Sequence, residues 1–165
     1  MKKEDVLIRM IAISGELPAE LVSEVVGSES YAAVLVTKLK KEGFISVRNS
    51  GGYKGYILRS KGKKYLLTSY EEDLSFFLSG SAQTNHIKSE PDKRLRLHRM
   101  SEVWVYFWKI GIKIFQSQKP DLGNGFEKSG KKAVYYGSLE YKESTDAIKG
   151  SRACGVLLAG ESAYV

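Results

Sequence analysis

The sequence predicts an α+β fold in two parts. Residues 1–43 repeat apolar side chains at helical spacing, and residues 44–58 alternate around a Ser-Gly-Gly turn as paired strands do. Near the end of the chain, residues 132–165 hold further strand-like runs, which indicate a second sheet. The 165 residues suffice for two small domains. We expect these domains at 1–80 and 93–165, with a small, polar linker over 81–92.

Two short helices are predicted before residue 28. Residues 4–13 place apolar side chains at i, i+1, i+4 and i+5, which gives the helix one core-facing side, and Gly15 ends it. Residues 19–26 repeat this pattern behind Pro18, a residue favoured near the start of a helix. Each helix should therefore bury one side.

The third predicted helix organises the first part of the chain. Tyr31, Leu35 and Leu39 recur every four residues and form one apolar stripe. Ser28 or Ser30 can cap the helix by accepting a hydrogen bond from its free N–H groups. The remaining side chains of this helix are small or basic and should face away from the core.

A hairpin and a basic helix should follow. Gly43 can end the third helix, residues 44–48 and 53–58 then form two strands, and the basic helix begins at Ser60. Residues 28–69 contain nine Lys and Arg against two Glu, a balance of +7 that equals the net charge of the whole chain. A cationic helix beside a cationic hairpin suits a phosphate backbone, where each neutralised phosphate releases a counterion.

Three short helices followed by a hairpin resemble the winged helix-turn-helix DNA-binding domains of bacterial regulators. The resemblance rests on residues 30–43 with the following Phe-Ile, on the Ser-Gly-Gly tip, and on residues 58–67, which resemble the start of the helix behind the wing. It implies that the third helix enters the major groove of duplex DNA. The side chains that it places toward the bases are Ser30, Ala33, Thr37 and Lys41. Those expected at phosphates or beside them are Lys38, Lys40, Arg48, Lys54, Arg59, Lys61, Lys63 and Lys64.

Three other interpretations of these features stay open. The lysines would also suit a solvated helix face, and the DNA-binding domain could belong to a transcriptional regulator. A protein-binding module would instead use Trp104 and Trp108 with the hairpin aromatics Tyr53 and Tyr56.

If the third helix does bind DNA, its sequence specificity should be modest, because it lacks the Arg, Asn and Gln side chains that make bidentate contacts with bases.

Residues 93–111 predict a long helix with a wide apolar arc. Three arginines crowd its first half, where the helix dipole disfavours cations, so we expect an anionic partner there, either external or the acidic segment 71–73. His98 lies among these arginines and is expected to be a structural residue, at the surface or half-buried. The predicted buried arc consists of Leu95, Leu97, Met100, Val103, Trp104, Phe107, Trp108 and Ile110.

Strands are predicted over 112–116, 132–140 and 153–159, and the last is nearly all apolar, as at the centre of a sheet. Another strand begins at 162, where we expect either a sheet edge or a chain that continues past residue 165. These strands and the helix before them match the α-β-β-β-α-β order of a small nuclease-like α/β domain.

One pair of motifs in this part resembles the PD-(D/E)xK nucleases: Pro120-Asp121 and Glu140-Tyr141-Lys142. The resemblance implies that Asp121 and Glu140 bind Mg²⁺ while Lys142 positions or polarises the attacking water. Residues i and i+2 of a strand face one side, so Glu140 and Lys142 should point to one place, and Glu102 could add a carboxylate. A solvated strand face and a non-catalytic, nuclease-like sheet are the alternatives.

Together the two parts resemble the replication-relaxation family of plasmids and integrative elements. Its members pair an N-terminal winged helix with a helix that begins near a histidine, here Leu97-His98-Arg99, and with a nuclease-like sheet. Residues 133–165 also resemble members in which the chain continues beyond this point. The resemblance implies a role in the replication or transfer of a mobile element, or in its regulation.

Composition sets the remaining expectations. An isoelectric point near 9.3 indicates an anionic partner, with nucleic acid ahead of a membrane. The chain has no apolar run of membrane-spanning length and no signal-peptide pattern, and its single cysteine fits a reducing cytosol. Two histidines and one cysteine are too few for a zinc site. We therefore expect a cytoplasmic protein that binds double-stranded DNA and no membrane, without a cofactor unless the Mg²⁺-dependent nuclease alternative holds. A homodimer is left open.

Overall fold

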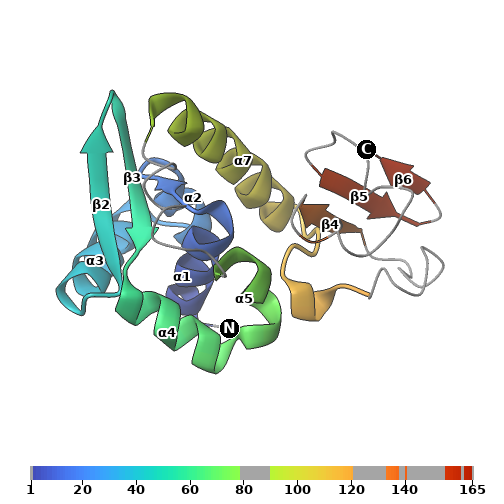
Figure 1. Cartoon of the computed structure of the whole chain (residues 1–165), viewed down its shortest axis with the longest axis horizontal. Coiled ribbons are helices and arrows are strands. Elements are labelled where there is room, and N and C mark those ends of the chain that lie inside the picture. Colours follow the sequence, from blue (N-terminus) through green and yellow to red (C-terminus); the bar gives the residue numbers. More distant parts are fainter. Residues whose placement is uncertain are drawn as a thin grey trace. The chain divides into compact units, whose positions relative to one another are not determined.

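The computed structural model describes residues 2–78, 90–120, 133–137, 140, 155–160 and 162–164. It has a mixed α+β fold with two small antiparallel sheets of three strands each (Figure 1). The chain divides into two compact units, Met1–Tyr106 and Phe107–Val165. Over the described ranges, none of the helices combines the length and the apolar character needed to cross a membrane.

Helix α1, Lys3–Ser14, forms the centre of the first unit. The sequence predicts one buried side, but α1 is buried all round from Val6 to Ser14. The reason is that other elements of the unit pack around it, among them α2, Leu21–Val26 (Figure 1). Gly15, whose φ is +73°, ends α1 and turns the chain away from it.

Helix α3, Glu29–Lys41, begins at the predicted serine cap, where the Ser28 hydroxyl oxygen accepts a hydrogen bond from the Tyr31 N–H at 3.3 Å. Leu35 and Leu39 are buried as predicted. The placement of Tyr31 in the same stripe is wrong, because its side chain is exposed. Ala32 takes the buried position in the first turn instead, and one side of α3 therefore stays open to solvent.

The first sheet has the strand order β1-β3-β2, with β1 at Leu17–Pro18, β2 at Ile45–Ser50 and β3 at Tyr53–Leu58. Strands β2 and β3 form the predicted hairpin, in which Ser50 pairs with Tyr53. The two glycines between them have φ values of +60° and +79°, so the turn needs residues without a Cβ. Strand β1 pairs with β3 and joins the hairpin to the end of α1.

The described part of the first unit also contains α4, Ser60–Ser69; α5, Glu71–Leu78; and the first part of α7, Pro91–Lys109. Most of the predicted linker lies outside the described residues. The compact units divide between Tyr106 and Phe107, inside α7, whereas the sequence pattern places the division at 81–92. The first part of α7 belongs to the first unit because a buried polar cluster, described below, binds it to β1 and the hairpin.

The second unit contains a sheet of β4, Val134–Gly137, β5, Gly155–Ala159, and β6, Ser162–Tyr164. The central place predicted for the apolar strand is confirmed, because β5 lies between β4 and β6. The predicted strand over 112–116 is wrong: it is reduced to one parallel bridge between Lys113 and Val134, and a short 3₁₀-helix, η1 at Gln116–Gln118, follows.

Candidate nucleic-acid interface

The outward side of α3 carries the four side chains expected at the bases. Ser30, Ala33, Thr37 and Lys41 are all exposed, and Val34 lies among them with 65% of its surface accessible. These five residues lie at i, i+3, i+4, i+7 and i+11, so they form one stripe along the helix. We call them the outer stripe of α3.

Among the basic residues expected at phosphates, four are exposed and lie outside the ion pairs described next: Lys40 of α3, Lys54 of β3, Arg59, and Lys64 of α4. Together with Lys41 they have no carboxylate within ion-pair distance among the residues that the structure describes. Their charge is therefore available to an anionic ligand.

Lys38 and Arg48 differ from this group because acidic residues of the chain balance their charge. The Lys38 ammonium lies 2.8 Å from a Glu4 carboxylate oxygen and 4.0 Å from Glu42, and the hydrogen bond to Glu4 raises the pKa of Lys38. The Arg48 guanidinium points inward and lies 3.3 Å from Glu16. The basic side chain of strand β2 is thus turned toward an acidic residue of the protein. This is contrary to the expectation that Arg48 lies at the phosphate backbone.

The three lysines of α4 lie in different surroundings. Lys61 donates a hydrogen bond to the Glu42 carbonyl oxygen at 2.8 Å, and its ammonium lies 4.9 Å from the centroid of the Phe44 ring. Lys63 is half-buried, whereas Lys64 is exposed. Lys61 thus joins α4 to the end of α3.

A groove of about 550 Å³ runs along α3. It is lined by α2, by the flank of α3 that includes Lys40, and by Lys54 and Tyr56 of β3. Glu20 and Glu29, at the starts of α2 and α3, also line it. The groove thus carries charges of both signs.

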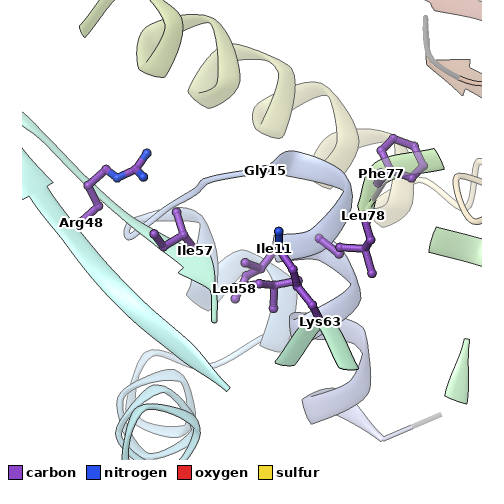
Figure 2. A pocket seen from close by; sticks show the side chains of 9 residues that line it. Ile11, Gly15, Arg48, Ile57, Leu58, Lys63, Phe77 and Leu78 are labelled. Carbon is purple, nitrogen blue, oxygen red and sulfur yellow. The ribbon is translucent and has the colours of Figure 1, made fainter. Parts of the chain in front are cut away.

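A second cavity, of about 120 Å³, lies between the ends of α1, α5 and the hairpin (Figure 2). Its lining is mainly apolar, with Ile11, Leu58, Phe77 and Leu78 among the contributors. Lys63 and Arg48 are the charged residues of that lining, and Arg48 is engaged by Glu16. The cavity holds no cluster of polar groups that would orient a ligand.

A buried polar cluster fixes the hairpin to α7, and Glu16 is its centre. The Glu16 side chain is fully buried between β1 and α7. The Arg94 guanidinium donates to both of its carboxylate oxygens, from Nη2 at 2.6 Å and from Nε at 3.0 Å. His98 Nε2 lies 2.9 Å from the same carboxylate. One carboxylate therefore receives hydrogen bonds from two positions one turn apart on α7.

Arg94 also donates to the hairpin backbone. Its Nη1 bonds the Ser50 carbonyl oxygen, and its Nη2 bonds the carbonyl oxygens of Tyr53 at 2.9 Å and Arg48 at 3.2 Å. The Tyr53 ring packs edge-on against the His98 imidazole, with centroids 5.4 Å apart. Arg94 thus holds both strands close to the hairpin tip.

The charges in this cluster determine the pKa of Glu16. Burial by itself raises the pKa of the carboxyl, but the hydrogen bonds and positive charges of Arg94 and His98 outweigh it and hold the pKa below its usual value of 4.5. The folded state therefore favours the charged carboxylate. Glu16 contributes its full stabilisation above the unfolded-state pKa and loses it as the pH falls through the folded-state pKa.

Acid should therefore weaken the first unit through Glu16. We expect the free energy of unfolding of the native chain to exceed that of Glu16→Gln at about pH 7 and this difference to shrink as the pH falls below about 4.5. Urea denaturation of both proteins across that pH range measures the difference between their free energies of unfolding. The other carboxyls titrate in both proteins, so their contribution cancels in this difference. A difference that stays constant with pH would show that the charge of Glu16 is not what the cluster requires.

Sequence reasoning missed Glu16 and misassigned the buried side of α7. The side chains that α7 buries in the first unit are Arg94, His98, Ser101, Trp104 and Val105, whereas Leu95, Leu97 and Met100 are only half-buried. One of the three arginines, Arg94, has an anionic partner within the chain, and that partner is Glu16. His98 is buried in the cluster, so the expectation that it lies at the surface or half-buried is wrong.

Two of the four aromatic residues expected in a protein-binding module, Trp104 and Tyr53, pack inside the first unit. Trp104 is buried and packs edge-on against Phe77, with centroids 6.1 Å apart. Tyr53 packs against His98. These two rings are therefore not available as the binding surface that this alternative needs.

Of the three residues expected in a nuclease site, Asp121 and Lys142 lie outside the described residues. Glu140 has helical backbone three residues after β4, so its placement in the predicted strand 132–140 is wrong. Its carboxylate accepts hydrogen bonds from the Lys119 ammonium at 2.5 Å and the Gly137 N–H at 2.7 Å. Glu102 is exposed. Within the described ranges no cluster of three His, Cys, Asp or Glu could hold a metal ion.

Comparison of the chain with models of known protein families, with curated proteins and with solved structures gave no match.

Proposed function

We propose that the first unit is a winged helix that binds double-stranded DNA, with α3 in the major groove and the β2–β3 hairpin as the wing. The observation that carries this proposal is the exposed outer stripe of α3, flanked by cations that no carboxylate of the described chain neutralises. Positive charge that the protein leaves unpaired along one face favours a polyanion.

The dimensions of α3 suit this role. A helix of 13 residues is about 20 Å long, and the major groove of B-form DNA, about 12 Å wide, admits one helix. The wing cation is Lys54 on β3, which also lines the groove beside α3. Arg48 is left out of the proposed contact surface because Glu16 holds it, and Lys38 because Glu4 does.

The resemblance to the replication-relaxation family supplies the setting. On that basis we propose that the protein occupies duplex DNA at an origin, transfer or promoter site of a mobile element. The buried cluster supports the binding role indirectly, because Arg94 holds the hairpin in one conformation before DNA arrives and so reduces the ordering cost of binding.

Gel-shift titration of the full chain with random duplexes tests this proposal. Affinity should fall steeply between about 50 and 200 mM salt. The triple variant Lys40→Ala/Lys41→Ala/Lys54→Ala should bind more weakly, with a slope of log K against log salt that is smaller by about 0.9 for each lost phosphate contact.

Lys38→Ala is the matched control for that experiment. It removes a lysine from the same helix, but one whose charge Glu4 already balances, so it should change the salt slope much less than Lys41→Ala. The proposal fails if no duplex binds, or if binding is insensitive to salt and to the triple substitution.

A further inference from the structure

We propose that α3 distinguishes bases by contact with the methyl groups of thymine, so that the protein prefers A·T pairs and recognises them in the major groove. This inference rests on the proposed function, because it assigns the outer stripe of α3 to the base edges. It goes further by naming the chemical group that the stripe recognises.

The middle of the outer stripe is apolar and open to solvent. Val34 has the highest exposed fraction of the large apolar side chains that the structure describes, at 65%. Ala33 lies beside it and is also exposed. A protein gains nothing from hydrated methyl groups on its surface, but it gains affinity when a ligand covers them with apolar surface of its own.

Thr37 completes this apolar centre. Its hydroxyl donates a hydrogen bond to the Ala33 carbonyl oxygen at 2.8 Å, within α3 itself. The hydroxyl hydrogen is therefore engaged in the helix and is not offered to a base. What Thr37 can present to a ligand is mainly its methyl group.

Only one base displays an apolar group in the major groove. Thymine carries a methyl at C5, whereas guanine and adenine are read by bidentate side chains such as Arg and Asn, and cytosine by a carboxylate. Helix α3 has no Arg, Asn or Gln, and the outer stripe has no carboxylate. Lys41, the one charged member of the stripe, is the last residue of the helix, one turn beyond Thr37, so it lies outside the apolar centre formed by Ala33, Val34 and Thr37.

The charges around the stripe indicate a nucleic acid rather than an apolar protein surface. Lys40 and Lys41 extend from the end of α3, and Lys54 lies across the groove on β3. Glu20 and Glu29 line the same groove, so the cations are confined to the C-terminal end of α3 and to β3. An apolar centre beside these lysines suits the major groove, where methyl groups lie on the floor and phosphates line the edges.

Three duplexes of equal length separate this inference from its alternatives: alternating dA–dT, alternating dA–dU and alternating dI–dC. The dU duplex differs from the dT duplex only by the missing methyl. The dI–dC duplex shares the minor-groove pattern of A·T pairs and the major-groove pattern of G·C pairs. We expect the full chain to bind dA–dT at least about fourfold more tightly than either of the others, the factor for burying one methyl group.

Two variants of Thr37 provide the matched controls. Thr37→Ser keeps the hydroxyl and removes the methyl, so the preference for dT over dU should decrease. Thr37→Val keeps the methyl and removes the hydroxyl, so the preference should persist. Position 37 is exposed, and both variants should fold as the native chain does.

Several outcomes would overturn the inference. Equal affinity for dT and dU duplexes shows that the methyl is not recognised, while the proposed DNA binding stands. Equal affinity for dA–dT and dI–dC shows that α3 does not read the major-groove pattern of A·T pairs. Loss of the preference in Thr37→Val but not in Thr37→Ser assigns recognition to the hydroxyl. If none of the duplexes binds, the proposed function fails together with the inference.

Discussion

Replacing Arg94 with alanine is expected to lower the free energy of unfolding by about 3–5 kcal/mol, the usual cost of removing one partner of a buried ion pair. The Arg94 side chain is almost completely buried, and Glu16 is fully buried. The substitution would leave the Glu16 charge without its main donor and would leave the carbonyl oxygens of Ser50 and Tyr53 without theirs. Urea denaturation followed by circular dichroism measures the loss.

Two neighbouring substitutions define what this experiment means. Arg96→Ala removes an exposed arginine two residues along the same helix and should change stability by no more than about 0.5 kcal/mol. Arg94→Lys keeps the charge but replaces the planar guanidinium, with its five N–H donors, by an ammonium with three. It should therefore recover only part of the stability lost in Arg94→Ala. An Arg94→Ala protein as stable as the Arg96→Ala protein would contradict the structural role of the cluster.

The Arg94→Ala variant also tests how far the order of the hairpin depends on α7. Because Arg94 binds carbonyl oxygens on both strands near the tip, its loss should speed amide hydrogen exchange in β2 and β3 more than in α3. A winged helix isolated at residue 78 would lack Arg94 altogether. The first part of α7 is therefore a component of the DNA-binding unit that we propose.

Elements whose signal is local could be predicted from the sequence. Helix α3 has its cap, its buried leucines and its terminal glycine within 16 residues, from Ser28 to Gly43, so the pattern and the structure agree. The hairpin follows from alternation around two glycines. The central position of β5 follows from its apolar composition.

The buried cluster could not be predicted, because its partners lie far apart in the sequence. Glu16 is separated from Arg94 by 78 residues, and an acidic residue behind a helix-ending glycine is usually solvated. A signal was nevertheless present in α7. Arg94, His98 and Ser101 follow one another at spacings of four and three, which is one face of a helix, but the apolar arc beside them was the stronger pattern.

The catalytic hypothesis meets a similar difficulty at Glu140. The sequence places this residue in a strand beside Lys142, where two polar side chains would face a common site. In the structure the Glu140 carboxylate is buried and hydrogen-bonded to Lys119 and Gly137. A substitution at Glu140 would therefore disturb packing before it tested chemistry, and loss of cleavage in Glu140→Ala would not identify a nuclease.

The pair of Lys119 and Glu140 should contribute as much to the second unit as Arg94 does to the first. Both side chains are fully buried, and the Lys119 ammonium also lies 5.1 Å from the centroid of the Tyr136 ring. Lys119→Met keeps the length and apolar character of the side chain but leaves the Glu140 carboxylate buried without its counterion. We expect a loss of about 3–5 kcal/mol in the stability of this unit.

Because the chain divides into two compact units, hydrogen exchange of the β5 amides, with those of α1 as internal reference, reports on the second unit by itself. Lys119→Met should accelerate exchange in β5 and leave α1 unchanged. The double variant Lys119→Met/Glu140→Gln should recover much of the loss, because the amide removes the uncompensated charge and still accepts from the Gly137 N–H. If the double variant exchanges as fast as Lys119→Met alone, packing of the lysine chain rather than its charge holds the site together. If neither variant changes the exchange rate of the β5 amides, the proposed structural role of the pair is wrong. The metal-binding hypothesis for Glu140 would then need its own test.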